Sequence, residues 1–162
     1  MILVLNLNAS VDKKYKMNEL NKGLVMRALE VHNTPGGKGI HVANVISILK
    51  EDCIATGFLG GKTGEFIEDK LKEYNINQDF VKIQGDTREC LAIITDDLVQ
   101  TEILEPGPTV TNEEQEEFLN KYKSLMKNCN IIVASGSIPK NIPKDFYKTL
   151  IDIAKMKIKN FF

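Results

Sequence analysis

Residues 34–44 hold the densest group of side chains and backbone positions that could do chemistry. Three glycines, Gly36, Gly37 and Gly39, surround the cation Lys38, and an amphipathic helical pattern follows at once. Unpaired N–H groups at a helix start lie at the positive end of the helix dipole and bind anions. The stretch could therefore hold an anion or a ring of hydroxyls. A tight turn that only lets the backbone approach a neighbour explains the glycines equally well.

Three further polar side chains are expected near the ends of strands. Asp12 follows the apolar run of residues 2–7, Ser137 follows that of residues 130–134, and Arg88 lies close to a pair of predicted strands. Ligands of open α/β sheets bind at the carboxyl ends of the strands. A carboxylate accepts hydrogen bonds from sugar hydroxyls, and a guanidinium can bind a phosphate in bidentate fashion. The combination suits a polyol phosphate, although Asp12 could also serve as a turn former or helix cap.

Other chemistries fit the spacing poorly. The run Gly60-Gly61-Lys62-Thr63 resembles a nucleotide-binding P-loop, but the position where that motif requires its first glycine is Thr56. No G-x-G-x-x-G motif occurs at a strand end. The three cysteines, Cys53, Cys90 and Cys129, are far apart and odd in number, which indicates reduced thiols. With two histidines and no C-x-x-C, we expect no protein-held metal.

The elements that must position these residues alternate between strands and helices. Apolar runs predict buried strands at residues 2–7, 53–59 and 130–134, a further strand at 80–83, and an antiparallel pair at 88–95 and 99–104. Helices are expected at 39–49, at 65–74, from a capping box at Thr111 and Glu114, and from Pro143 onward. The first and last should bury Ile40, Ala43, Val45, Ile46 and Leu49, and Phe146, Leu150, Ile151 and Ala154. This order predicts an α/β fold with a mostly parallel sheet. Residues 13–34 have weak periodicity, as short exposed strands or a lid would.

Composition excludes several classes of protein. The chain has 162 residues, 43% of them hydrophobic and 27% charged, which suits one domain with a core. A net charge of −1 gives no bulk attraction to nucleic acid or an anionic membrane. No signal peptide and no apolar run of about 20 residues is present, so we expect a cytoplasmic protein. The chain stops after a helical pattern, where a strand should follow, so we expect the front part of a larger domain.

Several motifs, in order, resemble those of the PfkB (ribokinase-like) carbohydrate kinases. The likeness covers residues 1–156, and the branch it favours is that of the tagatose-6-phosphate kinases and 1-phosphofructokinases. The segments Asp86-Thr-Arg-Glu-Cys90 and Gln100-Thr-Glu-Ile-Leu-Glu105 favour the former. The motifs that carry the likeness are Asn8-Ala-Ser-Val-Asp12, Pro35-Gly-Gly-Lys-Gly39, Gly57-Phe-Leu-Gly-Gly61, Thr63-Gly-Glu-Phe66, Thr87-Arg88 and Ser135-Gly-Ser-Ile-Pro139.

The resemblance implies a three-layer sandwich with a small β lid, formed by residues 13–34 and 86–105, that also joins two subunits in a homodimer. It implies transfer of the γ-phosphate of ATP, with Mg²⁺, to a hydroxyl of a hexose phosphate. In this reading tagatose 6-phosphate becomes tagatose 1,6-bisphosphate. Asp12 and the Gly36–Gly39 turn would bind the sugar. Arg27, Lys38 and Arg88 would be candidates for its phosphate, and Ser137 would lie nearby.

The chain departs from the family pattern in sequence and in length. Ala9 replaces a proline, His41 a substrate-binding asparagine, and Asn44 an arginine. An imidazole cannot reproduce the paired hydrogen bonds of an amide, so His41 should alter sugar binding. The family's Gly-Ala-Gly-Asp motif, with the anion hole and catalytic aspartate, falls beyond residue 162, as does most of the ATP site. We therefore expect the chain alone to be inactive and prone to self-association. A 1-phosphofructokinase, a non-catalytic sugar-phosphate binder and a small interaction module remain alternatives.

Overall fold

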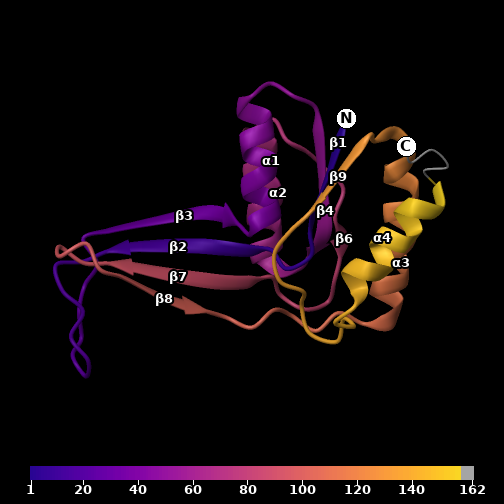
Figure 1. The fold of residues 1–162 in the computed structure, drawn as a ribbon. Coiled ribbons are helices and arrows are strands. Elements are labelled where there is room, and N and C mark those ends of the chain that lie inside the picture. Colours follow the sequence, from indigo (N-terminus) through magenta and orange to yellow (C-terminus); the bar gives the residue numbers. More distant parts are fainter. Residues whose placement is uncertain (158–162) are drawn as a thin grey trace.

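The computed structural model describes residues 1–157 and contains a central parallel sheet with helices on both faces (Figure 1). The order of its main strands is β5–β4–β1–β9, and β6 also pairs with β4. All of these pairs are parallel. The fold class that the sequence predicted, an α/β fold with a mostly parallel sheet, is confirmed. The strands are β1 (Ile2–Asn6), β4 (Cys53–Leu59), β5 (Asn77–Gln78), β6 (Val81–Lys82) and β9 (Ile131–Ala134).

The helices form two layers because alternate residues of the buried strands point to opposite faces. Leu3 and Leu5 of β1 pack in one apolar cluster with residues of α3 and α4, and Val4 packs in the other with residues of α1 and α2. The helices are α1 (Lys38–Ile48), α2 (Gly61–Glu73), α3 (Asn112–Leu125), a 3₁₀ turn (Met126–Asn128) and α4 (Phe146–Lys157).

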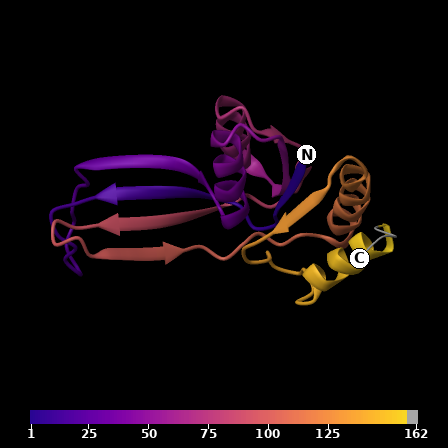
Figure 2. The ribbon, with the colours of Figure 1, turned by 45° about the horizontal axis from the view of Figure 1, so that its top comes forward.

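A second sheet projects away from the central one (Figures 1 and 2). Its order is β3–β2–β7–β8, in which β2 and β7 are parallel and the outer pairs are antiparallel. The segments expected to form a lid supply most of it, while its action as a lid stays a prediction. Its strands are β2 (Ser10–Lys16), β3 (Glu30–Gly36), β7 (Arg88–Ile94) and β8 (Gln100–Leu104).

Local signals set some boundaries correctly and others wrongly. The strand predicted at 53–59 matches β4, and the capping box of Thr111 and Glu114 is present at the start of α3. The helix α2 begins at Gly61, four residues before the expected position, because Gly60 acts as its N-cap. The last helix begins at Phe146; Pro143 instead offers its carbonyl to the Phe146 N–H in a preceding turn.

Four apolar side chains that were expected to be buried are exposed. The run of residues 130–134 was predicted to be a buried strand, yet Ile131 is 55% exposed. Val45 on α1, Leu49 at its C-cap and Ile151 on α4 were expected to face the core and are also exposed. These four side chains lie on surfaces that no element within residues 1–157 covers.

All three cysteines are free thiols. Cys53 and Cys90 are free and buried, and Cys129 is free and partly buried. Burial raises the pKa of the Cys53 and Cys129 thiols, which keeps both protonated and unreactive.

Within residues 1–157, every helix is too short or too polar to cross a bilayer.

Candidate functional site

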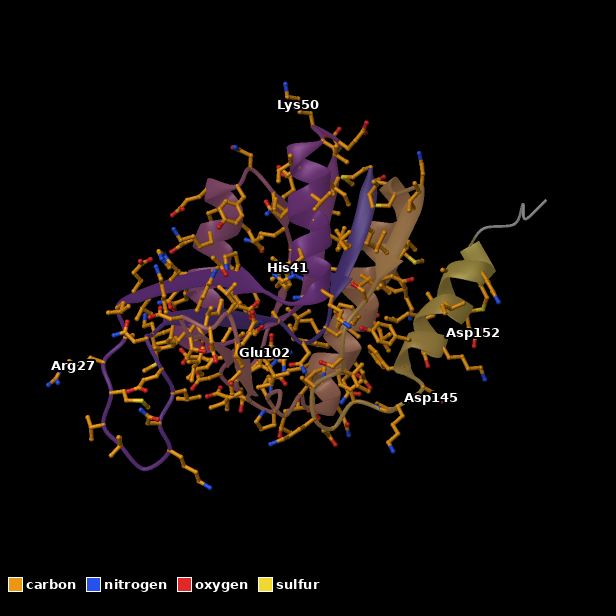
Figure 3. All side chains as sticks on the ribbon, turned by 60° about the vertical axis from the view of Figure 1, so that its left-hand side comes forward. Arg27, His41, Lys50, Glu102, Asp145 and Asp152 are labelled. Atoms are coloured by element: carbon orange, nitrogen blue, oxygen red, sulfur yellow. The ribbon has the colours of Figure 1, made fainter. Side chains whose placement is uncertain are left out.

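A cavity of about 590 Å³ opens where the carboxyl ends of β1 and β9 meet the second sheet. The start of α1 forms one wall, and β7 and β8 form another. Figure 3 shows His41 near the start of α1 and Glu102 on β8. The polar residues of the lining are Asn6, Asn8, Ser10, Asp12, Lys38, His41, Arg88, Gln100, Glu102 and Ser137, with Gly37 and Gly136.

The side chain of Asn6, at the end of β1, packs against the glycine turn and forms hydrogen bonds with it. Helix α1 begins after Gly37, whose φ of 105° favours glycine and whose lack of a side chain leaves the helix uncapped. The Asn6 Oδ1 accepts a hydrogen bond from the Gly39 N–H at 3.2 Å, and its Nδ2 donates to the Gly36 carbonyl at 3.4 Å. A Cβ at Gly37 would lie 2.5 Å from the Asn6 Nδ2. The turn is therefore both a close-packed corner and a wall of the cavity.

Asp12 lies inside β2, whereas a turn was expected there. Its Oδ1 accepts a hydrogen bond from the Ser10 hydroxyl at 2.7 Å, and its Oδ2 is 3.7 Å from the His41 Nε2. A Cβ at Gly36 would lie 2.2 Å from the Asp12 Cγ, so glycine at this position leaves room for the carboxylate. The second carboxylate oxygen remains able to accept a hydrogen bond from a ligand.

Arg88, Asn8 and Ser137 form a second connected group in the lining of the cavity. The Arg88 Nη1 donates to the Glu105 carbonyl at 3.1 Å, and its Nη2 donates to the Asn8 carbonyl at 3.3 Å. The Asn8 Nδ2 donates to the Ser137 Oγ at 3.0 Å. Because that hydroxyl accepts from Asn8, its own proton is free to donate into the cavity. The Arg88 Nε and the Asn8 Oδ1 are buried without a protein partner.

The structure brings together six of the nine residues proposed from sequence: Asp12, Gly37, Lys38, His41, Arg88 and Ser137. Two others, Gly36 and Gly39, shape the site from behind, against Asp12 and Asn6. Arg27 is not among the lining residues: it is exposed on the loop between β2 and β3, away from His41 and Glu102 (Figure 3).

Sequence reasoning missed several lining residues as site candidates. Asn6 ends β1, and Asn8 and Ser10 follow it; the last two had entered only as part of a family motif. Gln100 and Glu102 lie on β8 and had been noted only for the branch they resemble. For Asn6, Asn8 and Ser10 the available signal was their position at the end of a buried strand, since that edge is where ligands bind.

Two other chemistries find no support within the described residues. No group of three or more His, Cys, Asp or Glu side chains in residues 1–157 is placed to hold a metal ion. The P-loop-like lysine, Lys62, is 93% exposed and forms an ion pair with Glu65 on its own helix.

A parallel α/β sheet with a polar cavity at its strand ends and a second sheet beside it is an arrangement suited to a small polar substrate. The model of the pfkB family carbohydrate kinases matches residues 5–161. The chain therefore belongs to the PfkB family, as the sequence motifs predicted.

Relatives and solved structures agree with this family assignment. A tagatose-6-phosphate kinase of Staphylococcus epidermidis is 44% identical over 155 residues, which is 96% of this chain and 50% of the relative. A Thermotoga maritima structure named as a possible 1-phosphofructokinase has a TM-score of 0.90 at 31% identity, with 96% of this chain and 51% of that chain covered. Escherichia coli phosphofructokinase-2 in complex with substrates and products has a TM-score of 0.89 at 25% identity, with 96% and 51% covered. The chain spans about half the length of these proteins.

Proposed function

We propose that this chain forms the sugar-phosphate-binding part of a kinase that phosphorylates a ketohexose phosphate, converting tagatose 6-phosphate to tagatose 1,6-bisphosphate with ATP. The observation that carries the proposal is that one cavity combines a hydrogen-bond acceptor with a group of donors. The acceptor is Asp12 and the donors are Arg88 and Ser137, and all three line the cavity. The 44% identity to a tagatose-6-phosphate kinase supports the choice of substrate.

In this proposal the acceptor and the donors each bind one part of the substrate. The free oxygen of Asp12 accepts from a sugar hydroxyl, with the Gly37 backbone and His41 beside it. The phosphate accepts from the guanidinium of Arg88, the hydroxyl of Ser137 and the ammonium of Lys38. Charged hydrogen bonds of this kind are about twice as strong as neutral ones. The phosphate therefore dominates the affinity, and the hydroxyl contacts orient the sugar.

Transfer needs groups that the described residues do not supply. The proposed cofactors of the whole enzyme are ATP and Mg²⁺, for which residues 1–157 offer no cluster of metal ligands. Phosphoryl transfer depends mainly on positioning and charge stabilisation around the moving phosphoryl group. We therefore expect this chain alone to bind a hexose phosphate without transferring phosphate to it.

A 1-phosphofructokinase is the second candidate, favoured by the TM-score of 0.90 to the Thermotoga maritima structure. Both substrates are ketohexose phosphates and differ in which end carries the phosphate. If the phosphate of each substrate binds Arg88, the two sugars would have to bind in opposite orientations. Titration with both compounds decides between them.

The second sheet is the proposed lid and subunit contact. Val31 and Ile103, on its outer strands, are 50% and 55% exposed, and Leu104 is 59% exposed. Exposed apolar residues of this kind are favourable contact points between two copies. The structure of Escherichia coli phosphofructokinase-2 in an inhibited form is tetrameric, which supports association in this family. A phosphorylated sugar as substrate places the proposed activity in the cytoplasm.

Calorimetry of the 162-residue chain tests the binding function. We expect tagatose 6-phosphate to bind and unphosphorylated tagatose to bind at least tenfold more weakly, because a charged hydrogen bond contributes about 1.5–3 kcal/mol. Arg88→Ala should remove this preference. Lys62→Ala, a loss of charge outside the cavity, should leave it unchanged. Equal affinity for the two sugars would overturn the proposed phosphate-binding role of Arg88 and Ser137. Phosphorylation by the chain alone above trace rate would overturn its proposed inactivity.

A further inference from the structure

A tyrosine on α4 binds the backbone of the turn that carries Ser137 into the cavity. The Tyr147 hydroxyl donates to the Gly136 carbonyl at 3.1 Å and to the Ser135 carbonyl at 3.3 Å, so two consecutive carbonyls share one donor. Tyr147 belongs to the layer of α3 and α4, on the side of the central sheet away from α1 (Figure 1). Gly136 and Ser137, by contrast, line the cavity beyond the end of β9.

The two carbonyls determine the direction of two backbone donors. In a trans peptide group the C=O and the N–H point to opposite sides. The Ser135 carbonyl shares a peptide group with the Gly136 N–H, and the Gly136 carbonyl shares one with the Ser137 N–H. Because both carbonyls face the Tyr147 hydroxyl, both N–H groups point away from it, toward the side on which Gly136 and Ser137 line the cavity.

These two N–H groups are available to a ligand. Among the hydrogen bonds of residues 1–157, none has the Gly136 N–H or the Ser137 N–H as its donor. Gly136 has a φ of 96°, which glycine adopts readily. Consecutive N–H groups in a turn of this kind form an anion-binding concavity. The Arg88 guanidinium and the Ser137 hydroxyl line the same cavity, so the two amides add to donors already present there.

Asn8 binds the same turn from the end of β1. Its Nδ2 donates to the Ser137 Oγ at 3.0 Å and to the Ile138 carbonyl at 3.5 Å. Asn8 thus orients the Ser137 side chain, and Tyr147 orients the two peptide groups that precede it. Burial raises the pKa of Tyr147, so its hydroxyl keeps its proton and remains a donor at neutral pH.

We propose that Tyr147 is a positioning residue for phosphate binding: it holds the turn of residues 135–137 so that the amides of Gly136 and Ser137 donate to the phosphate of the substrate. The inference rests on the proposed function, and it adds to the site two backbone donors and a residue outside the cavity lining. Without the hydroxyl, two carbonyls lose their donor, and a carbonyl left unpaired away from water costs free energy. The peptide groups then rotate toward other donors, which turns the two N–H groups out of the cavity.

Nuclear magnetic resonance of the ¹⁵N-labelled 162-residue chain tests the two donors directly. Saturating tagatose 6-phosphate should shift the amide protons of Gly136 and Ser137 downfield, because a charged acceptor forms a stronger hydrogen bond than water does. Unphosphorylated tagatose should leave both resonances in place. The absence of these shifts with tagatose 6-phosphate, or equal shifts with both sugars, overturns the proposal without the need for any variant.

Tyr147→Phe tests the positioning role by calorimetry. We expect it to weaken tagatose 6-phosphate binding three- to tenfold and to change tagatose binding less than twofold, because only the phosphate uses the two amides. The downfield shifts should disappear. Tyr122→Phe is the matched control: the Tyr122 hydroxyl also donates to a backbone carbonyl, that of Leu150 at 3.0 Å, but Tyr122 lies outside the cavity lining. It should leave both affinities and both shifts unchanged.

The outcomes separate this inference from the proposed function. Equal affinity of the wild-type chain for the two sugars overturns both. A normal preference for tagatose 6-phosphate in Tyr147→Phe, with both amide shifts intact, overturns the inference and leaves the function standing. Equal weakening of the two sugars by Tyr147→Phe, or the same loss in Tyr122→Phe, would reflect a general effect of hydroxyl removal on the fold and also overturns the inference.

Discussion

Replacement of Asn6 by alanine should destabilise the fold through a contact between distant parts of the chain. Asn6 is 1% exposed at the end of β1, and its side chain acts as the missing cap of α1. The Gly39 N–H lies in the first helical turn, where backbone donors have no partner within the helix. In Asn6→Ala that donor loses its acceptor while the sheet still excludes water from it.

The size of the effect follows from the two hydrogen bonds. Loss of a helix cap costs about 0.5–2 kcal/mol, and a buried donor left unpaired costs about 1–3 kcal/mol. These figures describe the same 3.2 Å bond and are counted once, and the 3.4 Å bond to the Gly36 carbonyl adds little. We expect a loss of about 2–3 kcal/mol in the free energy of unfolding. For a chain of this size, that lowers the melting temperature by roughly 4–12 °C.

Urea denaturation measures this loss as a lower midpoint at unchanged slope. Asn33→Ala is the control, because Asn33 is an exposed asparagine on β3, and surface substitutions usually stay within about 0.5 kcal/mol. A loss below about 0.5 kcal/mol for Asn6→Ala would refute the capping role. An equal loss in both variants would mean that asparagine removal has a general cost unrelated to the turn.

Two further predictions concern the glycine turn and alkaline stability. Gly36→Ala should weaken tagatose 6-phosphate binding at least tenfold in calorimetry, because the added Cβ would displace the Asp12 carboxylate. The same substitution should lower the free energy of unfolding less than Gly37→Ala does, because alanine at position 37 would be strained by a φ of 105°. Burial raises the pKa of Tyr122 to about 12, so the unfolded chain loses this proton near pH 10 while the folded chain keeps it. Stability should therefore fall by up to about 2.7 kcal/mol between pH 10 and 12, and Tyr122→Phe should flatten that slope in urea denaturation. An unchanged slope would assign the loss to other groups.

The parts of the fold that sequence predicted are those set by neighbouring residues. The strand Cys53–Leu59 is a largely apolar run between Asp52 and the Gly60-Gly61 turn, and its ends match. The capping box depends on two residues three positions apart, Thr111 and Glu114, and it is formed. In both cases the signal and the structure it specifies lie within one segment, so tertiary contacts did not alter them.

The parts that sequence missed depend on contacts between segments. Asn6 bonds to the Gly36 carbonyl 30 positions away, and Asn8 bonds to Ser137 129 positions away. Nothing in the local pattern after the first strand distinguishes these asparagines from turn formers. The predicted burial of β9 was wrong for a related reason. An apolar sequence indicates which environment a strand prefers, whereas the exposure of its side chains depends on which elements cover them.

Arg88 shows why the site and the arrangement of the two sheets cannot be separated. Its guanidinium has five donors, and two of them bind the carbonyls of Glu105, just after β8, and Asn8, just after β1. These bonds hold the second sheet against the central one. Three donors remain, so a phosphate can bind Arg88 without breaking this joint. Lysine has three donors on a single nitrogen and could not hold both carbonyls and a phosphate in this planar geometry. The residue proposed to bind the phosphate is thus also the residue that fixes where the proposed lid begins.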